Sequence, residues 1–206
     1  MKSLTLSEIR RVLPNNKISQ PNDEFAGLRA AVSIVLRTNL GSIETLFILR
    51  AQREGDPWSG QIAFPGGHYE SKDQSMRETA ERETLEEVGI DLNKVAKYLG
   101  EVEPIGAIPR KTGKGLKVYP FVYLLDGQDP KFELNYEVSD IIWGSLNDMH
   151  TGDSQTKYMF KMDGENQRFP GYDLGAHVVW GLTYRMIHMF FEAVDPDWKF
   201  NPLVED

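Results

Sequence analysis

A tight turn followed by an acidic helix is the feature that most constrains this sequence. The segment Phe64-Pro65-Gly66-Gly67 cannot continue a regular strand, because proline lacks a backbone N–H group and the two glycines favour a sharp turn. The turn therefore predicts a loop whose backbone closely approaches another group. After it, either Asp73 or Ser75 is able to cap a helix that runs to Val88 and ends at Gly89.

Three carboxylates share one face of that predicted helix. Glu83, Glu86 and Glu87 are three and four residues apart, so their side chains meet, and like charges at this spacing cost roughly 0.2–0.5 kcal/mol per pair. A solvated acidic face is the simpler explanation of such a cluster on its own. The glycine turn and the capped helix start favour a bound cation instead, and hard divalent ions such as Mg²⁺ take oxygen ligands.

The whole stretch resembles the signature of the Nudix hydrolases, G-x5-E-x7-R-E-U-x-E-E-x-G-U, in which U is an aliphatic residue. The positions that agree are Gly67, Arg82, Glu83, Glu86, Glu87, Gly89 and Ile90. Asp73 stands where Glu is usual, and eight residues rather than seven separate it from Arg82. Thr84 also fills a slot that is normally aliphatic.

The resemblance implies an enzyme that hydrolyses a pyrophosphate linkage. It implies Mg²⁺ or Mn²⁺ held by the three glutamates and by the backbone at Gly66. Arg82 is expected to orient the glutamates by ion pairing, and Asp73 to support the loop. The general base is the least defined role, with Glu86 as the candidate inside the motif and Glu137 or Glu133 outside it. The catalytic candidates are Glu86, Arg82 and Glu83.

Segments around the motif resemble the coenzyme A pyrophosphatase branch of the family. They include Arg50-Ala51, the run from Gly60 to Gly67, the strand Val118–Val122 and the stretch Val179–Thr183. The branch implies cleavage of coenzyme A or its acyl esters into a phosphopantetheine product and adenosine 3′,5′-bisphosphate. Asp73 and the extra residue after it are also typical of this branch. The substrate-binding candidates are Arg50, Arg53, Trp58 and Gly67.

One departure from the pattern of this branch bears on the choice of substrate. The branch normally carries a basic residue in the region that Asp56-Pro57-Trp58 occupies here, and Arg53 or the basic loop 108–115 are the candidates to replace it. An ADP-ribose or nucleotide-sugar pyrophosphatase is therefore an alternative. A nucleotide-binding Nudix module without activity is a third hypothesis, against which the intact glutamates argue. Among the tryptophans, Trp58 is best placed to contact a base or sugar, whereas packing is the simpler role for Trp143, Trp180 and Trp198.

Composition narrows the function further. The formal net charge of −8 argues against non-specific binding of nucleic acids or anionic membranes, so a small nucleotide is the expected partner. The absence of cysteine excludes disulfides, thiolate zinc sites and cysteine nucleophiles, and it counts against the isopentenyl diphosphate isomerases and NADH pyrophosphatases. Without a long apolar run or an apolar signal core, a cytoplasmic protein is expected. A homodimer stays open, since several Nudix enzymes dimerise.

Hydrophobic periodicity predicts an α/β protein, and the resemblance implies the Nudix fold, an α/β/α sandwich with a mixed sheet. The expected domain limits are 1–27 for an N-terminal helix and connector, 28–195 for the Nudix domain and 196–206 for a tail. Besides the helix of the motif, the expected elements are helices at 4–13 and 177–193, strands at 29–37, 45–50, 98–105, 118–125 and 141–143, and a hairpin of 157–161 with 168–172.

Overall fold

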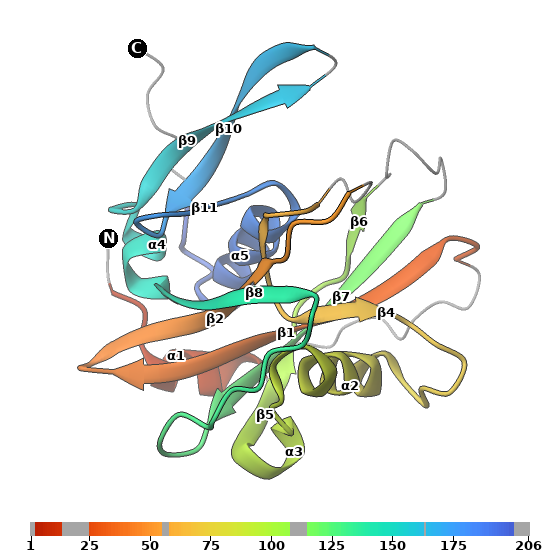
Figure 1. The fold of residues 1–206 in the computed structure, drawn as a ribbon. Helices are drawn as coiled ribbons and strands as arrows, with labels where there is room; N and C mark the ends of the chain where they lie inside the picture. Colours follow the sequence, from red (N-terminus) through yellow and green to blue (C-terminus); the bar gives the residue numbers. More distant parts are fainter. Residues whose placement is uncertain (1–2, 14–24, 55–57, 108–114, 163, 200–206) are drawn as a thin grey trace.

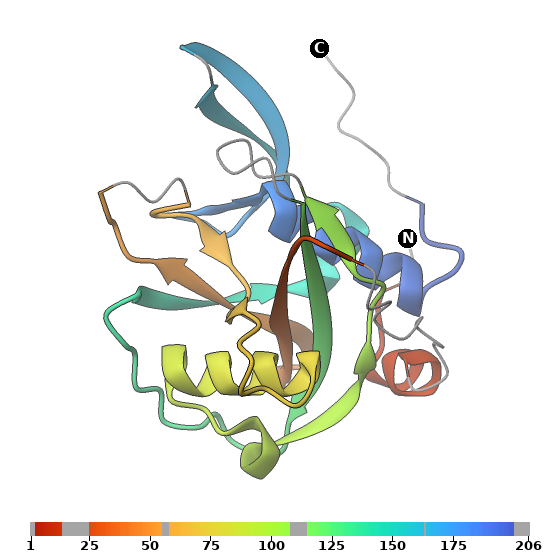
Figure 2. The same cartoon turned by 90° about the vertical axis from the view of Figure 1, so that its right-hand side faces the viewer.

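Helices cover both faces of a mixed β-sheet in the computed structural model, which describes residues 3–13, 25–54, 58–107, 115–162 and 164–199 (Figure 1). The helix α2 (Met76–Val88), followed by α3 (Leu92–Val95), lies on one face. The helices α1 (Leu6–Val12) and α5 (Gly181–Val194) lie on the other, as Figure 2 shows from the side. The predicted α/β/α sandwich is confirmed.

The centre of the sheet is a parallel pair of strands. The strand β1 (Leu28–Asn39) runs parallel to β7 (Leu116–Leu125), and the other pairings of this sheet are antiparallel. The main strand order is β3-β2-β1-β7-β5, while β4 pairs with β1, β6 with β7 and β8 with β2. The bounds of these strands are β2 (Ser42–Arg50), β3 (Ile62–Ala63), β4 (Gly66–His68), β5 (Ala96–Glu101), β6 (Ile105–Ala107) and β8 (Val138–Ser145).

The apolar run of β1 is explained by burial on both faces. Side chains alternate along a strand, so Ala31 and Val35 pack in the core beneath α2, whereas Ile34 and Leu36 pack in the larger core beneath α1 and α5. Central strands covered on both sides need apolar residues at nearly every position. Ser33 is the exception, and its role in the site is given below.

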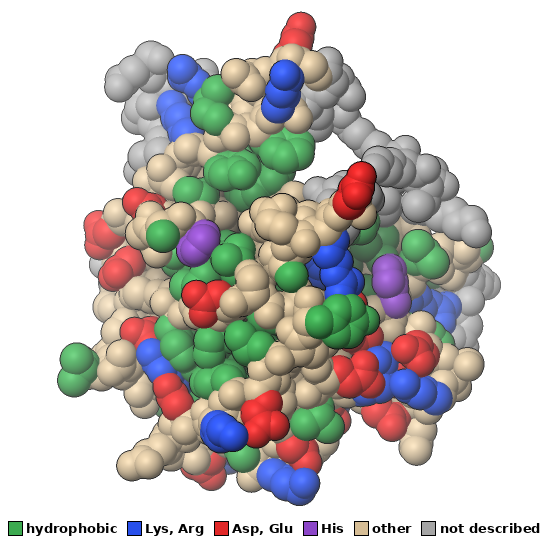
Figure 3. Space-filling model, in the orientation of Figure 1, with side chains coloured by type: hydrophobic (Ala, Val, Ile, Leu, Met, Phe, Trp, Pro, Cys, Tyr) green, Lys and Arg blue, Asp and Glu red, His purple; other side chains and the backbone are tan. Residues whose placement is uncertain are grey.

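A second, three-stranded sheet projects from the body of the molecule (Figures 1 and 2). It consists of β9 (Gln155–Met162), β10 (Glu165–Asp173) and β11 (Val178–Trp180) in the order β11-β10-β9. The predicted hairpin is confirmed, although residue 163 of its turn lies outside the described residues. Figure 3 shows apolar side chains gathered at the base of this projection.

The prediction of a helix over 177–193 was wrong at its start. Val178, Val179 and Trp180 pair with β10 instead, because β-branched and aromatic residues beside an open strand edge favour extended structure. The helix α5 begins at Gly181 and is apolar on one side only, since Arg185 and Glu192 are exposed. The short helix α4 (Leu146–Thr151) was not predicted.

Other boundaries differ less. The predicted strand 98–105 is divided into β5 and β6, with an irregularity of register between Tyr98 and Gly100. Trp198 is only 8% exposed and donates its indole N–H to the His150 carbonyl over 3.0 Å, so it packs on the domain as expected for a core tryptophan. The domain limits stay a prediction. None of the described helices is long and apolar enough to cross a membrane.

The partly buried His188 of α5 predicts a pH dependence of stability. Burial lowers the pKa of His188 from 6.5 to about 4, and its Nε2 lies 3.0 Å from the Tyr172 hydroxyl. Because the unfolded chain takes up the proton first, the contribution of His188 to stability is fully present above pH 6.5 and falls as the pH drops toward 4. The variant His188→Gln keeps a hydrogen-bond acceptor but cannot titrate. It should therefore lose about 2 kcal/mol less unfolding free energy than wild type on acidification.

Urea denaturation of both proteins at pH 7 and pH 4.5 measures the effect. An equal loss of unfolding free energy in wild type and His188→Gln would contradict it.

Candidate active site

Two glycines of β4 are packed between β1 and α2. Gly67 pairs with Ala31, and Gly66 pairs with Val32 at a φ of +155°. A Cβ on Gly66 would lie 2.3 Å from the Ala31 carbonyl oxygen, and one on Gly67 would lie 2.4 Å from the carboxyl carbon of Glu83. At Gly66 only glycine fits, because a Cβ would meet the backbone of β1, whereas at Gly67 a Cβ would displace the Glu83 carboxylate from the space in which it sits.

Glu87 is buried against the same turn. It is 2% exposed, and its Oε2 accepts a hydrogen bond from the Gly66 N–H over 2.8 Å. Burial raises the pKa of Glu87 to about 8; the Gly66 hydrogen bond opposes this shift and the nearby Glu83 charge adds to it. A cation beside Glu87 would reverse the effect, because positive charge stabilises the ionised carboxylate.

Arg82 connects the remaining carboxylates to the loop. Its Nε and Nη2 donate to both oxygens of Asp73 over 2.8 and 3.0 Å. Its Nη1 donates to Glu83 over 2.9 Å and to Glu86 over 3.3 Å, and Nη2 reaches the His68 carbonyl over 3.1 Å. The hydrogen bonds from Arg82 lower the pKa of the Asp73 carboxyl well below its usual range. Arg82 thus forms ion pairs with Glu83 and Glu86, and their orientation for catalysis by Arg82 stays a prediction.

Asp73 supports the loop and does not cap α2. It is buried, and it also accepts hydrogen bonds from the Glu70 N–H over 3.0 Å and the Thr79 hydroxyl over 2.8 Å. The cap is Ser75, whose hydroxyl accepts from the Glu78 N–H. The unusual acidic residue of the motif is therefore an anchor for Arg82, with every carboxylate contact directed into the protein.

A buried polar pair links α2 to β1. The Thr84 hydroxyl lies 2.8 Å from the Ser33 hydroxyl, and both lie within hydrogen-bond distance of the Ala80 carbonyl. Ser33 also donates its backbone N–H to the Pro65 carbonyl over 2.8 Å. One strand residue thus holds both the glycine turn and the acidic helix. This explains why Thr occupies a normally aliphatic slot, and that irregularity was the sequence signal for a contact that sequence reasoning missed.

The carboxylate oxygens are suitable ligands for a hard divalent cation, but the side chains do not converge on one point. Glu83 and Glu87 place oxygen donors beside the glycine turn, and Glu86 is about half exposed at 51%. Within the described part of the chain, no three acidic or histidine side chains converge as a ready metal site. Arg82 holds Glu83 and Glu86 in this arrangement, so Glu83 would have to turn from Arg82 toward an ion beside Glu87.

The predicted substrate-binding residues lie at the end of β2 and in the following loop. Arg50 is the last residue of β2, and its charge acts on Glu87. Arg53 forms an ion pair with Glu137 over 2.8 Å and lies 4.5 Å from the ring centre of Tyr136. Trp58 is 45% exposed, in keeping with a contact residue.

Of the other predicted residues, some lie outside the described part of the chain, and Glu133 and Glu137 are held in ion pairs. Residues 55–57 and 108–114 are not described, so the basic loop is not placed. Glu133 is exposed and pairs with Lys131 over 2.9 Å. The Arg53–Glu137 pair couples a predicted substrate residue to a predicted base, a contact that no spacing in the sequence indicates.

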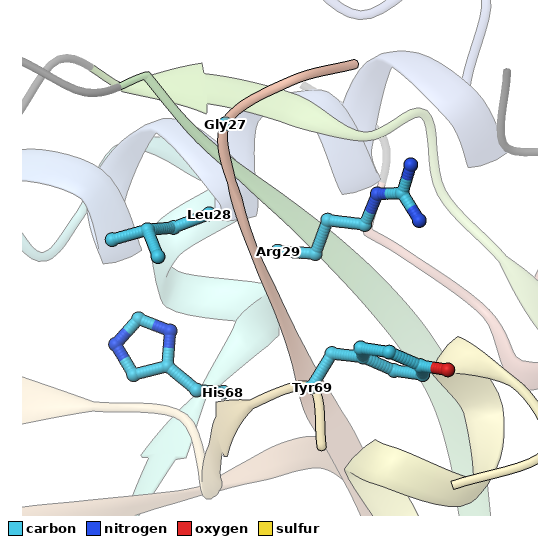
Figure 4. Close-up of a pocket in the computed structure, with 5 residues that line it drawn as sticks. All are labelled: Gly27, Leu28, Arg29, His68 and Tyr69. Atoms are coloured by element: carbon cyan, nitrogen blue, oxygen red, sulfur yellow. The ribbon is translucent and has the colours of Figure 1, made fainter. Parts of the chain in front are cut away.

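A hollow of about 300 Å³ opens beside the glycine turn (Figure 4). It is lined by Gly27, Leu28, Arg29, His68 and Tyr69, and the Tyr69 N–H donates to the Arg29 carbonyl over 3.0 Å. Leu28 and His68 point to one side of β1, while Arg29 and Tyr69 point to the other. The hollow therefore combines a cation, an imidazole and a phenol immediately after the glycines.

Comparisons with known proteins show similarity over most of the chain. The NUDIX domain model matches residues 27–162. The chain is 32% identical over 150 residues to an uncharacterized Nudix hydrolase, NudL, of Photorhabdus laumondii, covering 73% of this chain and 77% of that one. It is 30% identical over 168 residues to the mitochondrial coenzyme A diphosphatase NUDT8 of Mus musculus, covering 81% and 78%. A MutT/nudix family protein from Enterococcus faecalis has the same fold, with a TM-score of 0.57 at 14% identity over 97% of this chain and 73% of that one.

The buried Ser33–Thr84 contact predicts coupled effects of mutation. Thr84→Val and Ser33→Ala should each cost about 1 kcal/mol of unfolding free energy, because each removes the shared hydrogen bond. The double variant should cost about 0.5–1 kcal/mol less than the sum, since that bond is lost only once. Each single variant should also need more Mg²⁺ for half-maximal activity, because α2 is less firmly held against the glycine turn.

A double-mutant cycle by chemical denaturation, with Mg²⁺ titrations of activity, checks both effects. Strictly additive stability losses and an unchanged Mg²⁺ requirement would show that the pair holds nothing in place.

Proposed function

Because the chain belongs to the Nudix hydrolase family, we propose that it hydrolyses coenzyme A and its acyl esters at the pyrophosphate linkage. Nudix enzymes hydrolyse the pyrophosphate bond of a nucleoside diphosphate that is linked to a second moiety, so the reaction class follows from the family. The choice of substrate is carried by the likeness to the mouse coenzyme A diphosphatase, which extends over 81% of this chain and thus well beyond the motif. The Asp73 anchor and the extra residue before Arg82 agree with that branch.

The reaction consumes one water molecule. Its oxygen forms a bond to one phosphorus while the bond from that phosphorus to the bridging oxygen breaks, and the bridging oxygen leaves with the other phosphate. The products are a phosphopantetheine and adenosine 3′,5′-bisphosphate. A bound Mg²⁺ or Mn²⁺ would supply positive charge to the phosphate oxygens.

The three glutamates differ in the roles that their surroundings support. Glu87, buried and hydrogen-bonded by Gly66, and Glu83, seated above Gly67, suit the holding of a cation at a fixed place. Glu86 is the most exposed of the three and can reach a water molecule, so we assign it the role of base. Glu137 is engaged by Arg53, which favours a part in positioning that arginine.

The hollow beside β4 supports a substrate larger than a simple nucleotide. Arg53 is bound to Glu137, so it is a poor replacement for the basic residue that the branch normally carries. Arg29 provides another positive charge next to the glycines, and Lys117 stands beside Arg29 in the parallel register of β1 and β7. We assign the adenosine arm, with its additional phosphate, to this end of the site.

Substitutions in the glutamates separate the roles. Glu83→Gln and Glu87→Gln should each lower Mg²⁺-dependent turnover by about 100-fold or more, because an amide is a weak ligand for a hard cation. Thermal stability should stay close to that of wild type, since Gln at position 87 still accepts from the Gly66 N–H. Glu86→Gln should lower kcat with little change in the Mg²⁺ requirement.

Initial rates across a Mg²⁺ series, together with thermal melting, make this test. Full activity in both Glu83→Gln and Glu87→Gln would refute the metal assignment.

A substrate series decides the substrate class. We expect cleavage of coenzyme A with Mg²⁺ to exceed that of ADP-ribose, a nucleotide sugar and a dinucleoside polyphosphate, scored by products identified by mass. Glu83→Gln serves as the control for contaminating enzymes. Faster cleavage of ADP-ribose would support the alternative pyrophosphatase instead, and tight binding without turnover of any compound would support a binding module.

A further inference from the structure

Four aromatic side chains form a cluster that belongs to neither core. The ring of Trp180 lies 4.7 Å from that of Tyr158, 4.8 Å from Phe160 and 5.4 Å from Phe169, measured between ring centres. All four side chains are partly exposed, and none packs in the two buried clusters of the domain. The packing role expected for Trp180 is therefore met by the projecting sheet alone, and the rings keep a surface toward solvent.

The cluster occupies one face of the three-stranded sheet. Phe169 is opposite Tyr158 in the ladder of β9 and β10, and Trp180 is opposite Gly171 in that of β10 and β11, so the four rings share one face. Figure 3 shows this apolar surface at the base of the projection, above the body of the molecule. An exposed group of aromatic rings of this kind is typical of a binding surface.

This face is connected directly to the catalytic turn. The Cα atoms of β11 and β3 approach within 8 Å, and the Thr183 hydroxyl donates to the Ile62 carbonyl over 3.2 Å. Three residues lead from Ala63 at the end of β3 to Gly66, a distance of at most about 11 Å. The aromatic surface and the glutamates therefore lie within reach of one extended ligand.

Charge decides which part of a ligand the face suits. The cations of the hairpin, Lys157, Lys161 and Arg168, alternate with the aromatic positions and so lie on the opposite face. Among the described residues of the aromatic face there is no Lys or Arg, and Glu165 adds a negative charge. A phosphate-bearing arm would find no positive charge on this face. An uncharged, apolar arm would bind favourably, because both its own surface and the aromatic rings would be removed from water.

A second copy of the chain is a poorer occupant. Two β9 edges paired antiparallel about Met159 would place Lys157 of each copy opposite Lys161 of the other, and like charges directly opposite destabilise a sheet. The lysines thus protect the edge from pairing while the rings beside it stay accessible.

We propose that the aromatic face formed by Tyr158, Phe160, Phe169 and Trp180 binds the acyl end of an acyl-coenzyme A. The inference rests on the proposed function, and it adds a preference among substrates. The phosphopantetheine arm contains two amide groups and is about as long as four extended residues, roughly 14 Å. With the pyrophosphate at the glycine turn, an arm of that length extends toward the aromatic rings, and the acyl chain linked through the thioester covers the remaining distance.

The test compares octanoyl-coenzyme A with coenzyme A in wild type, Phe160→Ala and the matched control Met159→Ala. Phe160 belongs to the aromatic face, and Met159 is its exposed neighbour on the opposite face of the same strand. Two readouts are taken: kcat/KM with Mg²⁺, and the dissociation constant by calorimetry in EDTA, where no turnover occurs. Light scattering records the oligomeric state of all three proteins.

Wild type should prefer octanoyl-coenzyme A in both readouts, and Phe160→Ala should reduce that preference about tenfold, as expected for the loss of one partly buried aromatic side chain. Met159→Ala should keep the preference, and coenzyme A itself should be handled alike by all three. Equal affinity of wild type for the two ligands, or a preference that Phe160→Ala leaves intact, would overturn the inference. So would a dimer that Phe160→Ala dissociates.

The two readouts keep the inference apart from the proposed function. If coenzyme A is cleaved but octanoyl-coenzyme A is not preferred over it, only the proposal of an acyl site is refuted. If nothing is cleaved, the proposed function fails, and the calorimetric preference alone decides the acyl site.

Discussion

The close packing of the glycine turn between β1 and α2 is the constraint on which the site depends. Gly66 lies against the backbone of β1 without room for a side chain, and Gly67 leaves the space that Glu83 fills. This contact brings the Gly66 N–H within 2.8 Å of Glu87. Carboxylates on a helix surface are usually solvated. Here Glu83 and Glu87 are partly removed from water, and a cation beside them would stabilise their ionised forms.

The supports of the turn are polar and buried, which is costly unless every group is satisfied. Asp73 meets this condition by receiving Arg82, the Glu70 N–H and the Thr79 hydroxyl. Ser33 and Thr84 meet it through each other and the Ala80 carbonyl. Both irregularities of the motif, an aspartate for a glutamate and a threonine for an aliphatic residue, therefore lie in the structure that positions Glu83 and Glu87.

The sequence predicted the elements whose signal is local. The turn, the helix from its serine cap to Gly89 and the apolar strands 29–37 and 118–125 follow from residue type and periodicity, and they lie where expected. Contacts across the sheet could not be predicted, because Ser33 and Thr84 or Arg53 and Glu137 meet only through tertiary packing. The prediction of where α5 begins was wrong for the same reason, since Val178–Trp180 forms a strand only because it pairs with β10. The aromatic face also depends on this pairing, which places Trp180, expected to pack, against Tyr158, Phe160 and Phe169 on the projecting sheet.

The central claim is that water cleaves the pyrophosphate of coenzyme A at this carboxylate site. Mass spectrometry of the products formed in ¹⁸O-labelled water with Mg²⁺ tests it most directly. The account predicts phosphopantetheine and adenosine 3′,5′-bisphosphate in equal amounts, with one labelled oxygen in one of the two, and no product with Glu83→Gln. Release of the 3′-phosphate as labelled inorganic phosphate, or unchanged coenzyme A, would contradict it.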